Sequence, residues 1–235
     1  MKILGVIPAR GGSKGIPRKN LKRVAGKPLI AYATEAALKS KLLDRIIVST
    51  EDREIARVAK RYGAEVPFIR PKKLAQDEIS TIPVVQHAMK YLEKSEGWRA
   101  DVIASIQPTS PLIEATDIDS AVNKLIKTGC DSVVSVSKIA HGHPYWAMKL
   151  EGDRIIPLNP KGYRCLQKQN LPSFYVLNGA LYVRKRKLLE NWSGHDFALG
   201  KDVRAIVMDE TKSIDIDTPL DLIIAENLIK AKKTL

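Results

Sequence analysis

A short segment near the N-terminus combines the residue types that bind polyphosphates. The ten residues from Arg10 to Lys19 contain three glycines and four cations, and Pro8 and Ala9 connect them to the apolar run at residues 3–7. Glycine lets backbone N–H groups turn toward an anion, while Lys and Arg supply the opposite charge. Neither the dinucleotide-binding spacing G-x-G-x-x-G nor the ATP-binding motif G-x-x-x-x-G-K-[S/T] occurs. We therefore expect a loop that wraps a polyphosphate after the first strand; the alternative is a basic surface turn.

Two aspartates near the other end of the chain have the spacing of a metal site. In an extended segment, Asp215 and Asp217 would point to one face, with their α-carbons about 7 Å apart. Two such carboxylates suit Mg²⁺ (or Mn²⁺), which completes its coordination with substrate phosphates. The alternative is helix capping, because Asp217 begins an Asp-Thr-Pro sequence that is typical of a helix start. Together with the glycine-rich loop, the pair favours the metal.

Other polar residues interrupt or follow apolar runs. Gln107 opens the sequence QPTSPL, a rigid turn that is either purely structural or presents the Gln107 amide to a ligand. An Asn-Gly pair at residues 178–179 interrupts another apolar run. His141 and His143 lack a third residue with zinc-ligand spacing, so we expect their loop to contact a substrate or a neighbouring subunit.

Several of these stretches carry a family resemblance. The string IPARGGSKGIPRKN at residues 7–20 resembles the signature of the acylneuraminate cytidylyltransferases. The QPTSPL turn, the NGA at residues 178–180 and the segment at residues 74–87 are similar to further motifs of that family, in the same order. The resemblance implies a cytidylyltransferase that joins CTP to a nonulosonic (sialic-type) sugar acid and releases pyrophosphate. The same chemistry on legionaminate, pseudaminate or 3-deoxy-octulosonate is the alternative.

Residue chemistry and the resemblance together give each candidate site residue an expected role. The residues expected to bind the nucleotide are Ala9, Arg10, Gly11, Gly12, Ser13, Lys19, Asn20 and Ser80. The residues expected to bind the sugar acid are Asn20, Gln107, Arg164, Lys168 and Gln169. Arg10, Lys19 and Asp215 are the expected catalytic residues, and Asp215 and Asp217 are the expected metal ligands.

The expected sugar-binding stretch departs from the family pattern. Family members carry Arg-Arg-Gln before a Leu-Pro pair, whereas this chain has RCLQKQNLP at residues 164–172. Gln169 aligns, but Lys168 replaces an Arg, which changes a bidentate contact with the sugar carboxylate into a point-charge contact. Arg164 is the candidate to compensate. The departure leaves the exact sugar acid open.

The expected strands and helices alternate regularly up to residue 137. Apolar runs predict strands at residues 3–7, 45–50, 66–70, 101–106 and 132–137. The alternation predicts an α/β class protein, a single Rossmann-like domain over residues 1–235 with a mostly parallel sheet and helices on both faces. Ligands bind such sheets beyond the carboxyl ends of the strands, which is where the glycine-rich loop and Gln107 would lie.

Residues 140–175 break the alternation. Two short strand patterns around residues 146–150 and 154–156 are joined by a Glu-Gly-Asp sequence, which favours a hairpin. We expect a protruding β extension that acts as a substrate lid or a dimerisation element. The resemblance implies a homodimer.

Composition predicts a cytoplasmic protein that handles small anions. The 235 residues carry a formal net charge of +13, but the cations are spread along the chain without interleaved aromatics, which disfavours nucleic-acid binding. Two cysteines do not form a disulfide framework, and we expect neither a leader peptide nor a membrane span. The remaining alternatives are a basic nucleic-acid-binding protein and a catalytically silent nucleotide-binding regulator.

Overall fold

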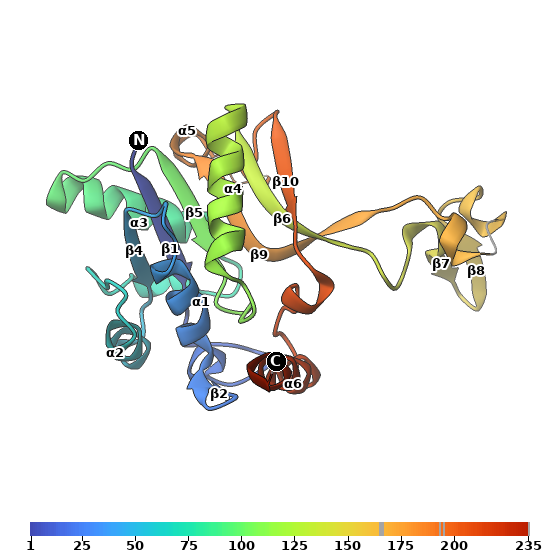
Figure 1. The fold of residues 1–235 in the computed structure, drawn as a ribbon, viewed down its shortest axis with the longest axis horizontal. Helices are drawn as coiled ribbons and strands as arrows, with labels where there is room; N and C mark the ends of the chain where they lie inside the picture. The colour runs from blue at the N-terminus through green and yellow to red at the C-terminus, as the bar shows by residue number, and fades with distance from the viewer. Residues whose placement is uncertain (165–166, 193, 195, 235) are drawn as a thin grey trace.

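A six-stranded sheet forms the centre of the computed structural model, which describes residues 1–164, 167–192, 194 and 196–234 (Figure 1). In spatial order its strands are β10 (Val203–Val207), β6 (Ser132–Lys138), β9 (Tyr175–Lys185), β5 (Val102–Ile106), β1 (Ile3–Pro8) and β4 (Arg45–Ser49). Within this sheet, β9 runs antiparallel to its neighbours β5 and β6, while the pairings of β1 with β4, β1 with β5 and β10 with β6 are parallel. The predicted α/β class with a mostly parallel sheet is therefore confirmed.

Helices cover both faces of this sheet (Figure 1). The helices are α1 (Leu29–Leu38), α2 (Arg53–Arg61), α3 (Thr81–Glu96), α4 (Ala115–Thr128), α5 (Arg186–Glu190) and α6 (Pro219–Thr234). Ile3 and Ile7 of β1 join the core cluster beneath α1, α2 and α4, whereas Leu4 and Val6 join the cluster beneath α3 and α5. Because both faces are buried, β1 is apolar at consecutive positions, which made it recognisable as a strand.

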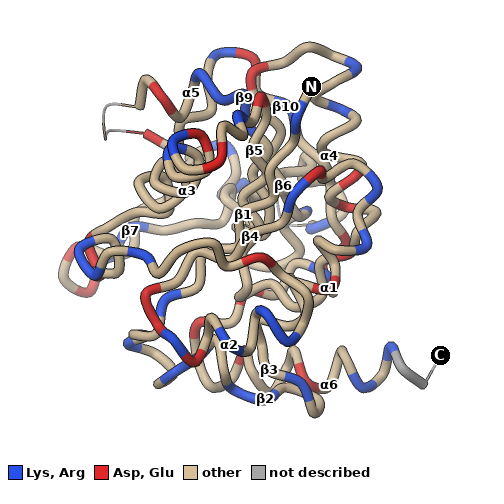
Figure 2. The backbone as a smooth tube through the Cα atoms, turned by 90° about the vertical axis from the view of Figure 1, so that its left-hand side faces the viewer, with Lys and Arg blue, Asp and Glu red and all other residues tan. Residues whose placement is uncertain are grey.

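Short elements complete the described chain. They are η1 (Lys19–Leu21), β2 (Arg23–Val24), β3 (Lys27–Pro28), η2 (Lys72–Ala75), η3 (Pro144–Trp146), η4 (Gly162–Arg164), η5 (Lys168–Asn170) and η6 (Glu210–Lys212). None of the described helices combines the length and apolar composition that a bilayer crossing requires. Figure 2 shows Lys and Arg interspersed with Asp and Glu along the chain, consistent with the charge pattern of the sequence.

A long arm projects from the sheet (Figure 1). β6 and β9 lead into it, and the antiparallel hairpin of β7 (Met148–Glu151) and β8 (Arg154–Pro157) lies at its far end. Gly152, with φ of 64°, makes the turn of this hairpin as the Glu-Gly-Asp sequence predicted. The protruding β extension is confirmed.

One predicted strand is wrong. Residues 66–70 form no strand, and the nearest pairing is a single bridge between Ile47 and Glu65. Pro67 has no N–H to donate, so this segment cannot continue the ladder along β4. The Arg70 N–H instead donates to the Thr50 carbonyl at 2.8 Å, which fixes the segment beside the end of β4.

Candidate active site

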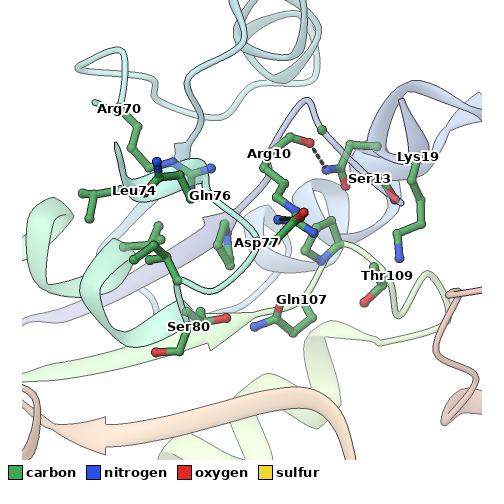
Figure 3. A pocket seen from close by; sticks show the side chains of 17 residues that line it. Arg10, Ser13, Lys19, Arg70, Leu74, Gln76, Asp77, Ser80, Gln107 and Thr109 are labelled. Atoms are coloured by element: carbon green, nitrogen blue, oxygen red, sulfur yellow. Dashed lines mark hydrogen bonds and ion pairs between the residues drawn. The ribbon is translucent and has the colours of Figure 1, made fainter. Parts of the chain in front are cut away.

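Two adjoining cavities lie at the carboxyl ends of β1 and β5. The first, of about 280 Å³, is bordered by the glycine-rich loop, and we call it the loop cavity (Figure 3). The second, of about 890 Å³, is bordered by β9 and the segment after α5, and we call it the sheet cavity. Both are lined by Ile79, Ser80, Thr81, Gln107 and Thr109. Ligands in the two cavities would therefore meet at this shared wall.

The loop cavity gathers most of the residues that the sequence indicates for the nucleotide (Figure 3). Its lining includes Arg10, Gly12, Ser13, Lys19, Asn20, Ser80 and Gln107. Ser80 occupies the position before α3, but its side chain makes no capping hydrogen bond to that helix. Ser80 thus lines both cavities without serving as a side-chain cap of α3.

The start of the loop is clamped by hydrogen bonds. The Asn20 side-chain amide donates to the Arg10 carbonyl at 2.8 Å, and the Gly11 N–H donates to Glu51 Oε1 at 2.6 Å. The other Glu51 oxygen accepts from buried Arg70 at 2.6 Å. The Gly11 amide, expected to face phosphate, therefore has a carboxylate acceptor in this structure, and it does not line the loop cavity. Ala9 is fully buried beside it.

The carboxylate of Asp77 lies beside Arg10 in the loop cavity. Asp77 pairs with Arg10 at 2.6 Å and with Lys14 at 2.9 Å, and Figure 3 shows Arg10 and Asp77 side by side at the centre of the cavity. Hydrogen bonds from Lys14 and Arg10 hold the pKa of the Asp77 carboxyl below its usual value. An anion that enters the cavity would compete with Asp77 for Arg10, which lines it.

Replacing Asp77 by asparagine is expected to tighten CTP binding. The substitution removes the competing charge, so the dissociation constant should fall by up to about five-fold, the size of an exposed ion pair. Titration calorimetry with CTP measures this, with Asp202→Asn as the control, because Asp202 pairs with Arg204 outside both cavities. Weaker CTP binding in Asp77→Asn would show instead that Asp77 helps to hold the nucleotide.

The glycine-rich loop and the paired aspartates contact each other directly, although nearly two hundred residues separate them in sequence. The Lys19 ammonium donates to the Ile216 carbonyl at 2.6 Å and to Asp217 Oδ1 at 2.8 Å. Gly15 approaches the same segment so closely that a Cβ added to it would lie 2.3 Å from the Asp217 carbonyl oxygen. Only glycine fits at this contact without displacing the backbone.

Replacing Gly15 by alanine is expected to force the loop away from Asp217. Displacing packed backbone costs about 1–3 kcal/mol, and the loop would separate from the aspartate pair. We expect a lower melting temperature and a weaker affinity for CTP with Mg²⁺. Gly12→Ala is the control for stability, because a Cβ built there meets no atom within 4 Å. Equal melting temperatures for the two variants would contradict the contact.

Hydrogen bonds from two sides fix the segment that carries the aspartates. The Ile216 N–H donates to the Thr109 carbonyl at 2.9 Å, which attaches the segment to the turn after β5. The Asn178 side chain donates to Ser213 Oγ at 2.9 Å, so the Asn-Gly interruption attaches the start of the segment to β9. Gly179, with φ of 75°, provides the backbone conformation that this interruption requires.

The capping alternative for Asp217 is resolved by its neighbours. The Thr218 N–H donates to Asp221 Oδ2 at 2.7 Å, and the Asp221 N–H donates to Thr218 Oγ1 at 3.3 Å, so these two residues cap α6 reciprocally. The Asp217 carboxylate accepts from Lys19 instead.

Asp215 is the more crowded member of the pair. Its carboxylate opens to the sheet cavity, and partial burial raises its pKa above the usual value. A hydrogen bond with Thr109 opposes the rise, and the nearby Asp217 charge adds to it. The described residues contain no group of three or more His, Cys, Asp or Glu side chains that could hold a metal by themselves. Two hard carboxylates beside the cation-lined loop cavity nevertheless fit Mg²⁺, because its remaining ligands are usually phosphate and water.

The residues expected to bind the sugar acid divide into two groups. Gln107 lines both cavities. Arg164, Lys168 and Gln169 lie in the arm, outside both cavities (Figure 1). Lys168 borders a separate hollow with Lys138 at the arm's base. The neighbouring residues 165–166 lie outside the described part of the chain.

The sequence did not single out several residues of the sheet cavity. Tyr182 and Arg184 project into it from β9, and Trp192 and Phe197 border it from the segment after α5. They belong to apolar or mixed runs that are typical of a core. The one available signal was a cation, Arg184, directly after the apolar stretch at residues 180–183.

His143 is a packing residue in this structure. It is buried, its Nδ1 accepts from the Tyr145 N–H at 3.2 Å, and its Nε2 lies 3.0 Å from the Pro172 carbonyl. Both ring nitrogens are thus engaged within the arm.

Comparisons with known proteins give consistent matches. The sequence model of a family described as cytidylyltransferase matches residues 4–149. The chain is 37% identical to CMP-N,N'-diacetyllegionaminic acid synthase of Legionella pneumophila, over 98% of this chain and 97% of that protein. It is 35% identical to pseudaminic acid cytidylyltransferase of Campylobacter jejuni, over 98% and 97% respectively.

A solved structure gives the same fold. CMP:2-keto-3-deoxy-manno-octonic acid synthetase complexed with CTP superposes with a TM-score of 0.73 at 19% identity, covering 99% of this chain and all of that one. At this identity the likeness supports the fold alone, a Rossmann-like α/β domain.

Proposed function

The chain belongs to the cytidylyltransferase family, and from that premise we propose that it transfers CMP from CTP to a nonulosonic sugar acid and releases pyrophosphate. The observation that carries the proposal is the direct contact between the cationic loop and the paired aspartates beside two joined cavities. A phosphate-binding loop and a candidate metal pair thereby border one space.

The two cavities suit the two substrates. The triphosphate and base of CTP occupy the loop cavity, and the sugar acid occupies the larger sheet cavity. Ser80, Gln107 and Thr109 belong to both, so they position the anomeric hydroxyl against the α-phosphorus. Orientation of this kind is the main contribution a protein makes to phosphoryl-type transfer.

The reaction is a displacement at the α-phosphorus. The anomeric oxygen forms a bond to phosphorus as the bond to the pyrophosphate oxygen breaks, and the hydroxyl proton passes to solvent. Arg10 and Lys19 neutralise the charge that moves onto the departing pyrophosphate. The triphosphate replaces Asp77 as the partner of Arg10.

A divalent metal, Mg²⁺ (or Mn²⁺), fits the pair of Asp215 and Asp217. When bound, the metal supplies charge neutralisation to phosphate oxygens and acidifies the attacking hydroxyl. Asp215 contributes a carboxylate whose charge is poorly compensated without a cation, as its raised pKa indicates. Lys19 holds Asp217 in place through its ion pair.

Pyrophosphate release from CTP tests the function. The purified protein is incubated with CTP and Mg²⁺ and, separately, with N-acetylneuraminate, N,N'-diacetyllegionaminate, pseudaminate or 3-deoxy-manno-octulosonate. We expect release that depends on the sugar acid and is fastest with a nonulosonic acid. If none of the sugar acids accelerated pyrophosphate release above the rate with CTP alone, the proposal would be overturned.

The position of the arm supports a homodimer. Arg164, Lys168 and Gln169 lie outside the cavities of their own chain, so they can meet a sugar acid only if the arm of one copy reaches the site of another. Leu150 and Ile155, which pair across the hairpin at its tip, are 67% and 65% exposed and offer adjacent apolar surface for a partner to cover. Sedimentation should give twice the 26.1 kDa chain mass; a monomer at assay concentrations would contradict the shared site.

A further inference from the structure

The sheet cavity contains one buried cation. Among the described residues that line it, Arg184 of β9 is the only Lys or Arg, and it is 4% exposed. Its guanidinium carbon lies 4.5 Å from the centre of the Tyr182 ring, two residues earlier on the same face of the strand. The ring thus supports one face of the guanidinium plane.

The contacts of Arg184 leave its charge without a counter-ion. Its Nε donates to the Phe197 carbonyl at 3.1 Å, and its Nη1 donates weakly to Ser105 Oγ at 3.5 Å. Within the described part of the chain, no carboxylate lies at ion-pair distance from it. Burial lowers the pKa of Arg184 to about 10, so the side chain still carries its charge at neutral pH.

The other buried arginines of the described chain differ in this respect. Arg70 pairs with Glu51 at 2.6 Å, and Arg186 pairs with Glu190 at 2.6 Å. Burying an unpaired charge is costly, and proteins normally provide a partner. The absence of a partner at Arg184, at the wall of a cavity, indicates that an anionic ligand supplies it.

We propose that Arg184 binds the carboxylate of the sugar acid in the sheet cavity, an inference that rests on the proposed function. In a 2-keto sugar acid the carboxylate is attached to the anomeric carbon, which also bears the attacking hydroxyl. Holding the carboxylate at Arg184 therefore fixes the position of the nucleophile. The guanidinium offers parallel N–H donors that match a carboxylate.

This assignment places carboxylate recognition within the chain that holds the nucleotide, and not at Arg164 and Lys168 of the arm, where the family resemblance would put it. The arm residues are then left to contact other groups of the sugar acid. The cavity's acidic side chains, Glu78, Asp196 and Asp215, cannot supply that recognition, because their charge repels a carboxylate. Asp196 is engaged within its own segment, where Oδ1 accepts from the Ala198 N–H at 2.8 Å. Arg184 provides the complementary charge.

A purely structural role must be separated from substrate binding, because Arg184 also anchors the Phe197 carbonyl. The probes are N,N'-diacetyllegionaminate, or the acid of the panel above that turns over fastest, and the C1 carboxamide of the same sugar. Arg184→Met removes the guanidinium. Arg184→Gln removes the charge but retains a donor for the Phe197 carbonyl. Lys185→Met is the matched control, because Lys185 follows on β9 and bonds the Gly129 carbonyl outside the cavity.

At saturating CTP, we expect Arg184→Met to lower kcat/KM for the acid about 100-fold, the size expected for losing one partner of a buried charge pair. The KM for CTP should stay near its wild-type value. The wild type should prefer the acid to the amide, and both Arg184 variants should lose that preference. If Arg184→Met fails to fold, the acid-over-amide preference of Arg184→Gln decides between substrate binding and a structural role. An acid-over-amide preference that persists in the folded variants would overturn the inference, whereas the absence of turnover in the wild type would instead overturn the proposed function.

Discussion

Replacing Asp215 by asparagine is expected to lower the rate of pyrophosphate release at least about 100-fold and, at the same time, to raise the melting temperature of the metal-free protein. The amide keeps the size of the side chain but is a poor metal ligand, and a catalytic divalent metal contributes several kcal/mol to such a reaction. Asp215 is destabilising without the metal, because partial burial raises its pKa in the folded state.

The sign of the stability effect follows from this pKa. Between the usual Asp value of 3.8 and the raised folded value, the folded protein binds more protons than the unfolded chain, so stability falls as pH rises through that window. The full destabilisation by the Asp215 charge persists at neutral pH, and it disappears at pH values below the usual Asp pKa of 3.8. The increase in melting temperature caused by Asp215→Asn should therefore be present at neutral pH in EDTA and vanish in acid.

Thermal melts in EDTA across this pH range, paired with the pyrophosphate assay, measure both effects. Asp217→Asn is the matched control, because it removes a carboxylate that is 72% exposed and paired with Lys19, and it should bring no gain in melting temperature. Near-normal turnover in Asp215→Asn, or a lower melting temperature at neutral pH, would contradict the assignment.

Replacing Arg10 by alanine is expected to lower kcat/KM for CTP about 100- to 1,000-fold, as for the loss of one preorganised donor to a developing charge. Arg10 lines the loop cavity, and the Asn20 side chain holds its backbone by bonding the Arg10 carbonyl. Steady-state kinetics with varied CTP measure the effect.

Lys14→Ala is the control for Arg10. Lys14 also pairs with Asp77, but its side chain is 79% exposed and does not line the loop cavity. We expect its loss to change kcat/KM by less than about five-fold, as for an exposed ion pair. If the two variants lost activity equally, general positive charge near the loop, and not the placement of Arg10, would explain the binding.

The central sheet could be predicted because its signals are local. β1 and β5 are short runs of mostly apolar residues, and Asp52 marks the start of α2 by accepting from two backbone N–H groups of its first turn. Residues 66–70 have the same apolar character, but a proline that cannot donate prevents pairing. Apolar composition alone therefore does not distinguish a true strand such as β1 from the unpaired segment at residues 66–70.

The candidate site was only partly predictable, for a related reason. Glycine, Lys and paired Asp are recognisable by type and spacing, so the loop and the aspartates could be identified separately. Their contact through Lys19 and Asp217 spans most of the chain and depends on the completed fold. Arg184 was missed because a buried cation on a strand resembles any other inward position until its missing partner is known.

The central claim is that the glycine-rich loop and the aspartate pair bind one triphosphate between them. A crystal structure with CTP and Mn²⁺, with the metal located by its anomalous signal, tests this most directly. We expect the triphosphate against Arg10 and Lys19, with Mn²⁺ joining its oxygens to Asp215 and Asp217. A triphosphate bound away from the loop, or a metal that contacts neither aspartate, would contradict the claim.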